Sequence, residues 1–255
     1  MKIVEVKNVR IGEGRPKICV PIIGETRDEL VLQGESVLEA PVDIVEWRGD
    51  YFSDIFHKTK ALDALKALRV ILHDIPLLFT FRTAKEGGAR DISLEDYSKL
   101  NKLILSTGSV DLIDVEAFTG EEVVKAIIGE AQDNGVKVIA SNHDFHKTPH
   151  KKEIIKRLRY MQKLGADIAK IALMPENKRD VLTVLEATLE MAESYGNTPI
   201  ITMSMGNDGV ISRLSGEFFG SSITFGALEK ASAPGQINVK ELSQFLDMLH
   251  NSLKQ

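Results

Sequence analysis

The sequence predicts an α/β protein with a (β/α)8 TIM barrel, preceded by a small N-terminal β-hairpin, in one domain over residues 1–255. Eight short apolar runs recur along the chain, and the segments between them carry helical periodicity. Such alternation is typical of a closed barrel of parallel strands. The alternative is a doubly wound open sheet, but no glycine-rich phosphate loop follows the first run, where a dinucleotide-binding sheet needs one.

The N-terminal segment, residues 1–16, predicts the β-hairpin. Its apolar residues Ile3, Val4 and Val6 are interspersed with charged residues, and the run then reaches Gly12-Glu13-Gly14. Alternation interrupted by glycine is typical of two short paired strands, so we expect this segment to lie outside the barrel.

The apolar runs predicted as barrel strands are rich in branched residues and end at turn-forming or polar residues. They lie at 17–22, 42–47, 76–81, 110–115, 136–140, 167–173, 199–203 and 222–225.

Glycine and proline residues indicate where the helices between these strands begin and end. Glycine is favoured just past a helix end, and proline is favoured in a first turn. Gly135 and Gly165 fit the first role, and Thr148-Pro149 fits the cap and first turn of a helix.

Composition narrows the class of protein. The chain has 43% hydrophobic and 27% charged residues and a net charge of −5, which suits a globular protein with an ample core. Basic residues are not clustered densely enough to indicate nucleic-acid binding. The single cysteine, Cys19, excludes intrachain disulfides and suits a reducing compartment. With no apolar segment suited to a signal peptide or membrane span, we expect a cytoplasmic enzyme or binding protein.

One strand carries an unexpected charge. The run 166–173 is apolar except for Asp167 near its start and Lys170 in its middle, and the period of two places Lys170 on the same face as Ile168 and Ala172. Burying an unpaired charge is costly, so this lysine must be paired with an acid, neutral, or open to a cavity. A lysine that extends to solvent or pairs with an acid is the ordinary interpretation, and the strand alone leaves the question open.

Polar side chains at the ends of the other strands favour a cavity. In a barrel, the C-terminal ends of the strands meet at one mouth, where reactive groups lie. Any one of these groups could be an ordinary surface charge, but their recurrence after successive strands indicates a site. The residues concerned are Glu46, Arg48, Arg82, Glu86, Asp114, Glu116, His143, Lys170, Arg213, Ser232 and Gln236.

These residue types suggest imine chemistry. A lysine in an apolar strand among Arg48, Arg82 and Arg213 is both desolvated and near positive charge, which favours the neutral amine. A neutral amine can attack a ketone to form a Schiff base. The imine acidifies the adjacent C–H, and His143 titrates in the range needed to take and return that proton.

No metal or organic cofactor is expected. Glu86 is placed to orient the imidazole of His143. The only histidines that lie close together near a strand end are His143 and His146. A zinc or other divalent site would need further histidine or aspartate ligands there.

Several stretches together resemble one family, the type I 3-dehydroquinate dehydratases, which are Schiff-base-forming hydro-lyases of the shikimate pathway. The similarity runs through nearly the whole chain and keeps the same order. The stretches are VEWRGD (45–50), TFRTAKEGG (80–88), SNHDF (141–145), ADIAKIA (166–172), SMGNDGVISRLSGE (204–217) and TFGALEKASAPGQI (224–237).

The resemblance implies an activity and a set of roles. The reaction is the dehydration of 3-dehydroquinate to 3-dehydroshikimate, the third step towards chorismate and the aromatic amino acids. Lys170 would form the imine, His143 would remove the C2 proton and help to expel the C1 hydroxyl as water, and Glu86 would position His143. The implied substrate-binding residues are Arg213 for the carboxylate, Ser232 and Gln236 from a closing loop, and Glu46, Arg48 and Arg82 for the hydroxyl groups. The resemblance also implies a homodimer and no cofactor.

Two other functions would also use a barrel of this kind. A class I aldolase also forms a Schiff base in a barrel, but its sugar-phosphate substrates need a phosphate site after the last strands, where Arg213 and Ser232 better suit a carboxylate. A barrel that only binds an anion would not need Lys170 and His143 on neighbouring strands. The loop 232–236, which contains Pro234 and Gly235, is either a lid that closes over substrate or a plain connection.

Overall fold

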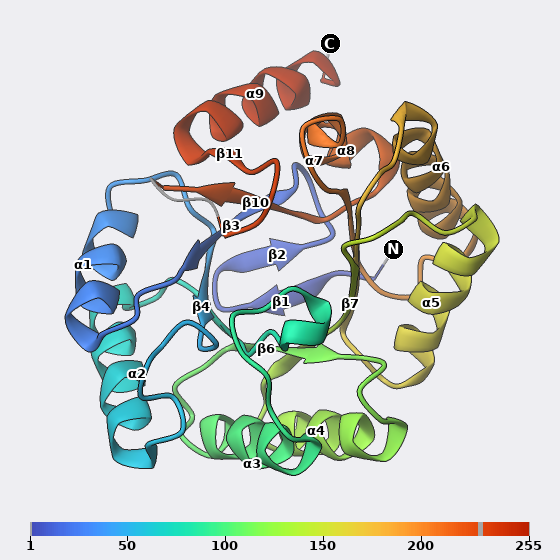
Figure 1. Ribbon diagram of the computed structural model, residues 1–255. Helices are drawn as coiled ribbons and strands as arrows, with labels where there is room; N and C mark the ends of the chain where they lie inside the picture. The colour runs from blue at the N-terminus through green and yellow to red at the C-terminus, as the bar shows by residue number, and fades with distance from the viewer. Residues whose placement is uncertain (1, 229–231, 255) are drawn as a thin grey trace.

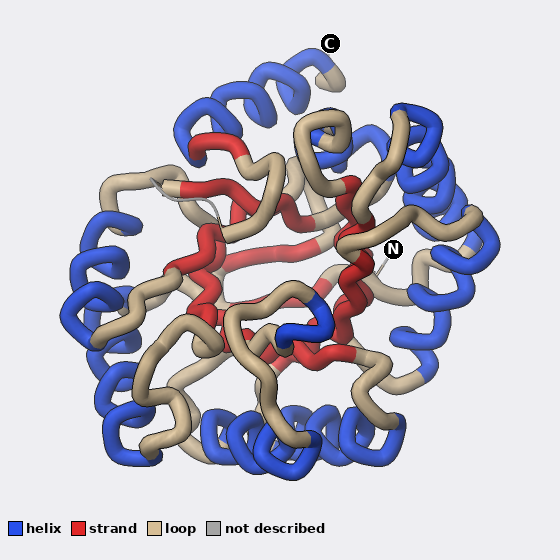
Figure 2. The backbone as a smooth tube through the Cα atoms, in the orientation of Figure 1, coloured by secondary structure: helices blue, strands red, loops and turns tan. Residues whose placement is uncertain are grey.

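The computed structural model describes residues 2–228 and 232–254. Seen end-on, its strands form the centre of the molecule and its helices surround them (Figures 1 and 2). The parallel strands are ordered β10-β3-β4-β5-β6-β7-β8-β9, so neighbours along the chain are neighbours in the sheet. The ring closes where the Ser222 N–H donates to the Ile200 carbonyl over 2.8 Å, beside a parallel bridge between Ile200 and Ser221. The (β/α)8 barrel prediction is confirmed.

The strands lie close to the predicted runs. Their bounds are β3 (Lys17–Ile22), β4 (Ile44–Arg48), β5 (Leu77–Thr80), β6 (Leu112–Glu116), β7 (Lys137–Asp144), β8 (Ile168–Leu173), β9 (Ile200–Ser204) and β10 (Ile223–Ala227), with the two-residue β11 (Ile237–Asn238) beside β10. The largest difference is β7, which continues through Asp144 because its residues 141–144 pair with Lys170–Leu173 of β8. His143 therefore lies within a strand and not in the loop after it.

Helices cover the outer face of the ring (Figure 1). They are α1 (Arg27–Val37), α2 (Lys58–Leu72), α3 (Leu94–Leu105), α4 (Glu121–Asp133), α5 (Lys151–Lys163), α6 (Lys178–Ser194), α7 (Val210–Leu214), α8 (Gly216–Phe219) and α9 (Val239–Ser252), with the 3-10 helix η1 (Ala84–Glu86) after β5. None of the helices in the described part of the chain is long and apolar enough to cross a membrane.

One predicted helix boundary is wrong. Helix α5 begins at Lys151 with His150 as its cap, two residues later than Thr148-Pro149 suggested. The Thr148 hydroxyl instead donates to the Met174 carbonyl over 2.9 Å and ties this loop to the end of β8. The predicted C-terminal glycines are confirmed, since Gly135 and Gly165 follow α4 and α5 with φ of +71° and +93°.

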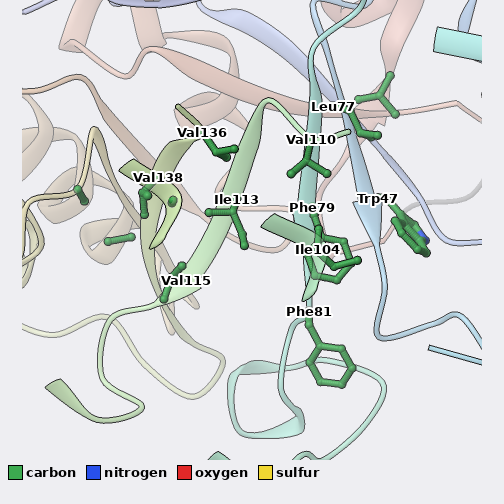
Figure 3. Close-up of a cluster of buried hydrophobic side chains, with 14 of the residues drawn as sticks. Trp47, Leu77, Phe79, Phe81, Ile104, Val110, Ile113, Val115, Val136 and Val138 are labelled. Carbon is green, nitrogen blue, oxygen red and sulfur yellow. The ribbon is translucent and has the colours of Figure 1, made fainter. Parts of the chain in front are cut away.

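The outer faces of the strands form the larger core. Branched and aromatic side chains pack there against the helices, as Figure 3 shows for part of the cluster that includes Trp47, Phe79, Ile113 and Val115. The rings of Trp47 and Phe79 meet edge-on with centroids 5.3 Å apart. The outer positions are mostly apolar, with exceptions such as Asn142 and Thr202, which hydrogen-bond to the covering helices.

The inner face is divided into an apolar floor and a polar mouth. Each barrel strand contributes an apolar inward residue towards its N-terminal end, as Ile44 and Ile168 illustrate, and these residues cluster with the hairpin of β1 (Val4–Val6) and β2 (Val9–Ile11). The hairpin is antiparallel, as predicted, and covers the N-terminal end of the barrel. Many of the later inward positions are polar and buried, such as Glu46, Asp114 and Lys170, so charged groups gather towards the C-terminal end.

Candidate active site

One cavity lies at the C-terminal mouth of the barrel, and it is lined by the side chains predicted for the site except Asp114 and Glu116, which are buried against Arg82. The lining side chains come from the strands β4, β7 and β8, the segment just after β5, η1, α7 and the loop after β10. These residues are Glu46, Arg48, Arg82, Glu86, His143, Lys170, Arg213, Ser232 and Gln236. The rest of the lining includes Ala172, Met203, Met205 and Phe225, which give the cavity an apolar wall.

Lys170 occupies the middle of β8 and is only 4% exposed. Its Nζ atom donates to Asp114 Oδ2 over 3.1 Å, lies 4.0 Å from Glu46 Oε1, and sits 4.4 Å from the centre of the Phe225 ring. The closest charged partners that it has in the described structure are therefore carboxylates. Arg48, Arg82 and Arg213 line the same cavity, as expected, but the sequence did not predict the carboxylates beside the amine.

Two arginines of the cavity, Arg82 and Arg48, are paired with acids. Arg82 contacts Asp114 Oδ1 at 2.7 Å and Glu116 Oε1 at 3.1 Å. Burial lowers the pKa of Arg82, but these carboxylates outweigh burial and hold the pKa well above its ordinary value. Arg48 makes two parallel hydrogen bonds to Asp50, of 2.8 and 2.7 Å, which fix its planar fork at the cavity wall.

Asp114 joins the lysine to this ion-pair network. Burial raises the pKa of Asp114, but the cations of Arg82 and Lys170 and a hydrogen bond from Ser141 outweigh burial, and the pKa lies below its usual range. The Ser141 hydroxyl donates to Oδ1 over 2.6 Å. Asp114 is therefore an ionised acceptor that holds the Lys170 amine in place.

Glu86 and His143 form a second buried pair. Glu86 ends η1, and its Oε2 atom lies 2.9 Å from His143 Nδ1 and accepts the backbone N–H of the same histidine, also over 2.9 Å. The next residue, Gly87, has φ of +83°, and a Cβ there would come within 2.2 Å of the Phe145 ring. A glycine is thus needed for η1 to bring Glu86 against the end of β7.

Burial and neighbouring charges shift both pKa values of this pair. Burial raises the pKa of Glu86 to about 8, opposed by the Arg82 guanidinium 3.8 Å away. Burial also lowers the pKa of His143 well below its usual value, and the cations of Arg82, Lys170 and Arg48 add to the effect. The imidazole is consequently neutral near pH 7, the form that can accept a proton.

Arg213 differs from the other arginines of the cavity. It is 2% exposed, and among the described residues no carboxylate forms an ion pair with it. Its Nη2 donates to the Pro234 carbonyl over 2.9 Å, its Nε is buried without a partner, and burial lowers its pKa to about 10. A buried cation that lacks an acid is suited to bind an anion.

The loop after β10 contributes Ser232 and Gln236. The Ser232 N–H donates to Gln236 Oε1 over 2.8 Å, and Gln236 Nε2 donates back to the Ser232 hydroxyl over 3.1 Å. Gly235 has φ of +77°, and a Cβ there would lie 2.4 Å from the Gly206 carbonyl oxygen, so the loop rests closely on the β9–α7 connection. Ala231, which begins the loop sequence, lies outside the described residues.

Sequence reasoning assigned no role to Asp50, Asp114, Ser141 or Phe225. The signal was present, because Asp50 follows Arg48 by two residues and Asp114 precedes Glu116 by two, the spacing that keeps side chains on one face of a strand. Spacing along the chain does not show which side chains of different strands contact one another in the barrel. Within the described ranges, no three His, Cys, Asp or Glu side chains are placed to hold a metal ion together.

Comparisons with known proteins agree with this geometry. The family model described as type I 3-dehydroquinase matches residues 18–253. The 3-dehydroquinate dehydratase of Clostridioides difficile strain 630 is 55% identical over 250 residues, covering 98% of each chain. That of Salmonella agona is 53% identical over 252 residues, covering 99% of this chain and all of the relative.

Solved structures match over the same length. The type I 3-dehydroquinate dehydratase from Clostridium difficile superposes with a TM-score of 0.96 at 55% identity over 98% of both chains. The 3-dehydroquinate dehydratase from Geobacillus kaustophilus has a TM-score of 0.95 at 36% identity, covering 98% of this chain and 97% of that one. The chain therefore belongs to the type I 3-dehydroquinase family.

Proposed function

We propose that this 3-dehydroquinate dehydratase converts 3-dehydroquinate to 3-dehydroshikimate through a covalent imine between Lys170 and the substrate ketone. The observation that carries the proposal is the buried Lys170 amine, held 3.1 Å from Asp114 in the wall of the cavity that His143 and Arg213 also line. The solved relative from Clostridium difficile carries covalently modified comenic acid, which supports covalent chemistry in this family.

Substrate binding follows from the distribution of charge. Arg213 lacks an acid partner among the described residues and can take both oxygens of the substrate carboxylate in its planar fork. Arg48 and Arg82 are fixed by acids and are suited to contact hydroxyl groups, together with Glu46. Ser232 and Gln236 complete the cavity from the loop, which we propose closes over substrate and excludes water.

Imine formation uses Lys170 in its neutral form, so the ammonium paired with Asp114 first gives one proton to the ketone oxygen. The amine nitrogen then attacks the ketone carbon, a second nitrogen proton moves to the same oxygen, and one water leaves as the protonated C=N bond forms. Asp114 remains ionised and orients the amine, while the Phe225 ring face lies against the developing positive charge. The protonated imine then withdraws electrons from the adjacent C2–H bond.

Elimination uses the neutral imidazole of His143. Nε2 takes the C2 proton while Nδ1–H is held by the Glu86 carboxylate, and the C–H electrons move into the enamine. The enamine then expels the C1 hydroxyl, which leaves as water with the proton that His143 returns. A further water hydrolyses the product imine and regenerates Lys170, so one water is lost overall.

Trapping the imine tests this mechanism. Borohydride added during turnover should reduce it to a stable amine and fix the substrate skeleton to Lys170. An assay for an ultraviolet-absorbing enone separates this activity from cleavage of a sugar phosphate, the reaction of the aldolase alternative. Family membership already weighs against that alternative.

We also propose that the enzyme is cytoplasmic and forms a homodimer. Apolar side chains exposed on outer helices, such as Val70 at 62% and Leu182 at 58%, are candidates for the contact. Sedimentation equilibrium would measure the mass, and a monomer at micromolar concentration would count against the dimer.

A further inference from the structure

A chain of hydrogen bonds connects the Glu86–His143 pair with helix α5 on the outer side of the barrel. Glu86 Oε1 accepts from Asn142 Nδ2 over 3.1 Å, and Asn142 Oδ1 accepts from Arg157 Nη1 over 3.1 Å. Arg157 Nε in turn donates to Glu153 Oε1 over 3.2 Å, on a half-buried side of α5. These hydrogen bonds therefore connect His143, through Glu86, with the surface of a helix.

Alternation along β7 explains why these hydrogen bonds can form. Asn142 and His143 are consecutive strand residues, so their side chains point to opposite faces. His143 lines the barrel cavity, whereas Asn142 meets Arg157 of the covering helix. The Glu86 carboxylate contacts both, with Oε2 on the histidine and Oε1 on the asparagine amide.

The partners of Asn142 determine which way its amide faces. The oxygen and nitrogen of an amide are nearly the same size, so their positions follow from what each neighbour can donate or accept. A guanidinium group only donates, so the amide oxygen must face Arg157 and the NH2 group must face Glu86. A second cavity of about 330 Å³ borders Asn142, Glu86 and His143, so packing does not surround the amide on that side.

We propose that Arg157 is a positioning residue for the catalytic pair: by fixing the amide of Asn142, it keeps an N–H donor on Glu86. This inference rests on the proposed role of His143 as the base. It assigns a task to a surface-helix residue that contacts neither the substrate cavity nor the catalytic pair itself.

The amide orientation decides which form of Glu86 is favoured. In the observed arrangement the carboxylate accepts three N–H groups, from Asn142, the His143 backbone and His143 Nδ1. With the ring proton on Nδ1, Nε2 keeps a lone pair and can take the substrate proton. A rotated amide would present its oxygen to Glu86 Oε1 and favour the protonated acid, whose proton would donate to that oxygen. The neutral acid then lacks the charge that stabilises a protonated imidazole.

The neighbouring charges set the direction of the effect. Burial and the Glu116 carboxylate raise the pKa of Glu86, which reaches about 8. The Arg82 guanidinium and the N–H groups of Asn142 and His143 lower it. Lys85 and Asp91 face the same group across the second cavity, and Lys170 and Arg48 act on His143 from the barrel side. Losing the amide donor removes one opposing contribution, so the base-competent pair forms only at higher pH.

The decisive experiment is the pH profile of kcat for Arg157→Ala. We expect its acid limb to move to higher pH by about one unit, the size expected for a lost hydrogen bond to a charged group. Activity near pH 7 should fall while KM changes little, and Arg157→Lys should restore part of the shift. Arg159→Ala is the matched control, because Arg159 lies on the same helix with its guanidinium 4.4 Å from the Tyr195 ring centre.

A double substitution tests whether Arg157 acts through Asn142. Asn142→Leu should shift the acid limb in the same direction, and adding Arg157→Ala should move it no further. Carbon-13 shifts of the Glu86 carboxyl group should show more protonated acid in Arg157→Ala than in the unaltered enzyme at the same pH. An Arg157→Ala profile that matches the unaltered enzyme, or shifts that add in the double variant, would overturn the inference.

A histidine variant separates this failure from failure of the proposed function. If His143→Ala lacks turnover while Arg157→Ala has an unaltered pH profile, only the positioning role is wrong. If His143→Ala keeps a near-normal rate, the proposed base is wrong, and with it the inference that rests on it.

Discussion

The Lys170 amine and the Asp114 carboxylate form a buried ion pair across the barrel, with Nζ and Oδ2 3.1 Å apart. Lys170 lies on β8 and Asp114 on β6, so β7 separates the two strands. The same carboxylate contacts Arg82 through its other oxygen. One acid thus fixes two cations, and the nucleophile is held by a network that reaches across the mouth of the barrel.

Asp114→Asn tests this arrangement. The substitution keeps the shape of the side chain but leaves Arg82 and Lys170 with less compensation, and breaking a buried pair typically costs about 3–5 kcal/mol. We expect a lower melting temperature and a kcat reduced by about tenfold or more, since the amine loses its fixed orientation. Asp111→Asn is the control, because Asp111 pairs with Arg69 at the other end of the barrel. Equal rates in the two variants would contradict the assignment.

Arg213→Met separates function from stability. Arg213 is a buried cation with a pKa lowered by burial to about 10, so an apolar side chain of similar length should not lower the melting temperature of the free enzyme. The substrate carboxylate would lose its partner, and KM should rise by about 100-fold for a charge-assisted pair worth roughly 3 kcal/mol. A large loss of stability with unaltered KM would show a structural role instead.

The pKa of Glu86 predicts how stability depends on pH. Burial raises it from 4.5 to about 8, so the folded state binds the proton more tightly than the unfolded state. The stability associated with this group is complete below about pH 4.5 and is lost as pH rises towards 8. Urea unfolding at pH 5, 6.5 and 8 should therefore show Glu86→Gln gaining stability relative to the unaltered enzyme as pH rises. Glu95→Gln, an exposed change on α3, should give a constant difference.

Gly235→Ala tests the fit of the loop. The new alanine Cβ would lie 2.4 Å from the Gly206 carbonyl oxygen, at a φ of +77°. The loop would therefore have to move away from its position beside Arg213, where Pro234 accepts a hydrogen bond. We expect a higher KM and a lower kcat with little change in melting temperature. Gly129→Ala, in helix α4 with open space around its Cβ, should raise stability by about 1 kcal/mol and leave KM unchanged. Hydrogen exchange across residues 232–236 should also slow when ligand binds.

The sequence predicted the barrel and the lining of its cavity because both follow from short-range patterns. Apolar runs gave the strands to within a few residues, and polar residues at their ends, such as Glu46 and His143, converge once parallel strands close into a ring. Spacing along the chain does not reveal which groups pair across that ring. The Lys170–Asp114 contact joins residues 56 positions apart, and the hydrogen bond from Arg157 to Asn142 depends on how α5 packs on β7.

The most direct test of the mechanism is borohydride reduction during turnover of 3-dehydroquinate, followed by peptide mass mapping. The account predicts a covalent adduct on the peptide that carries Lys170, absent from Lys170→Ala and still formed to some extent by His143→Ala, which lacks the base but keeps the nucleophile. An active enzyme whose Lys170 peptide stays unmodified under these conditions would contradict the imine mechanism.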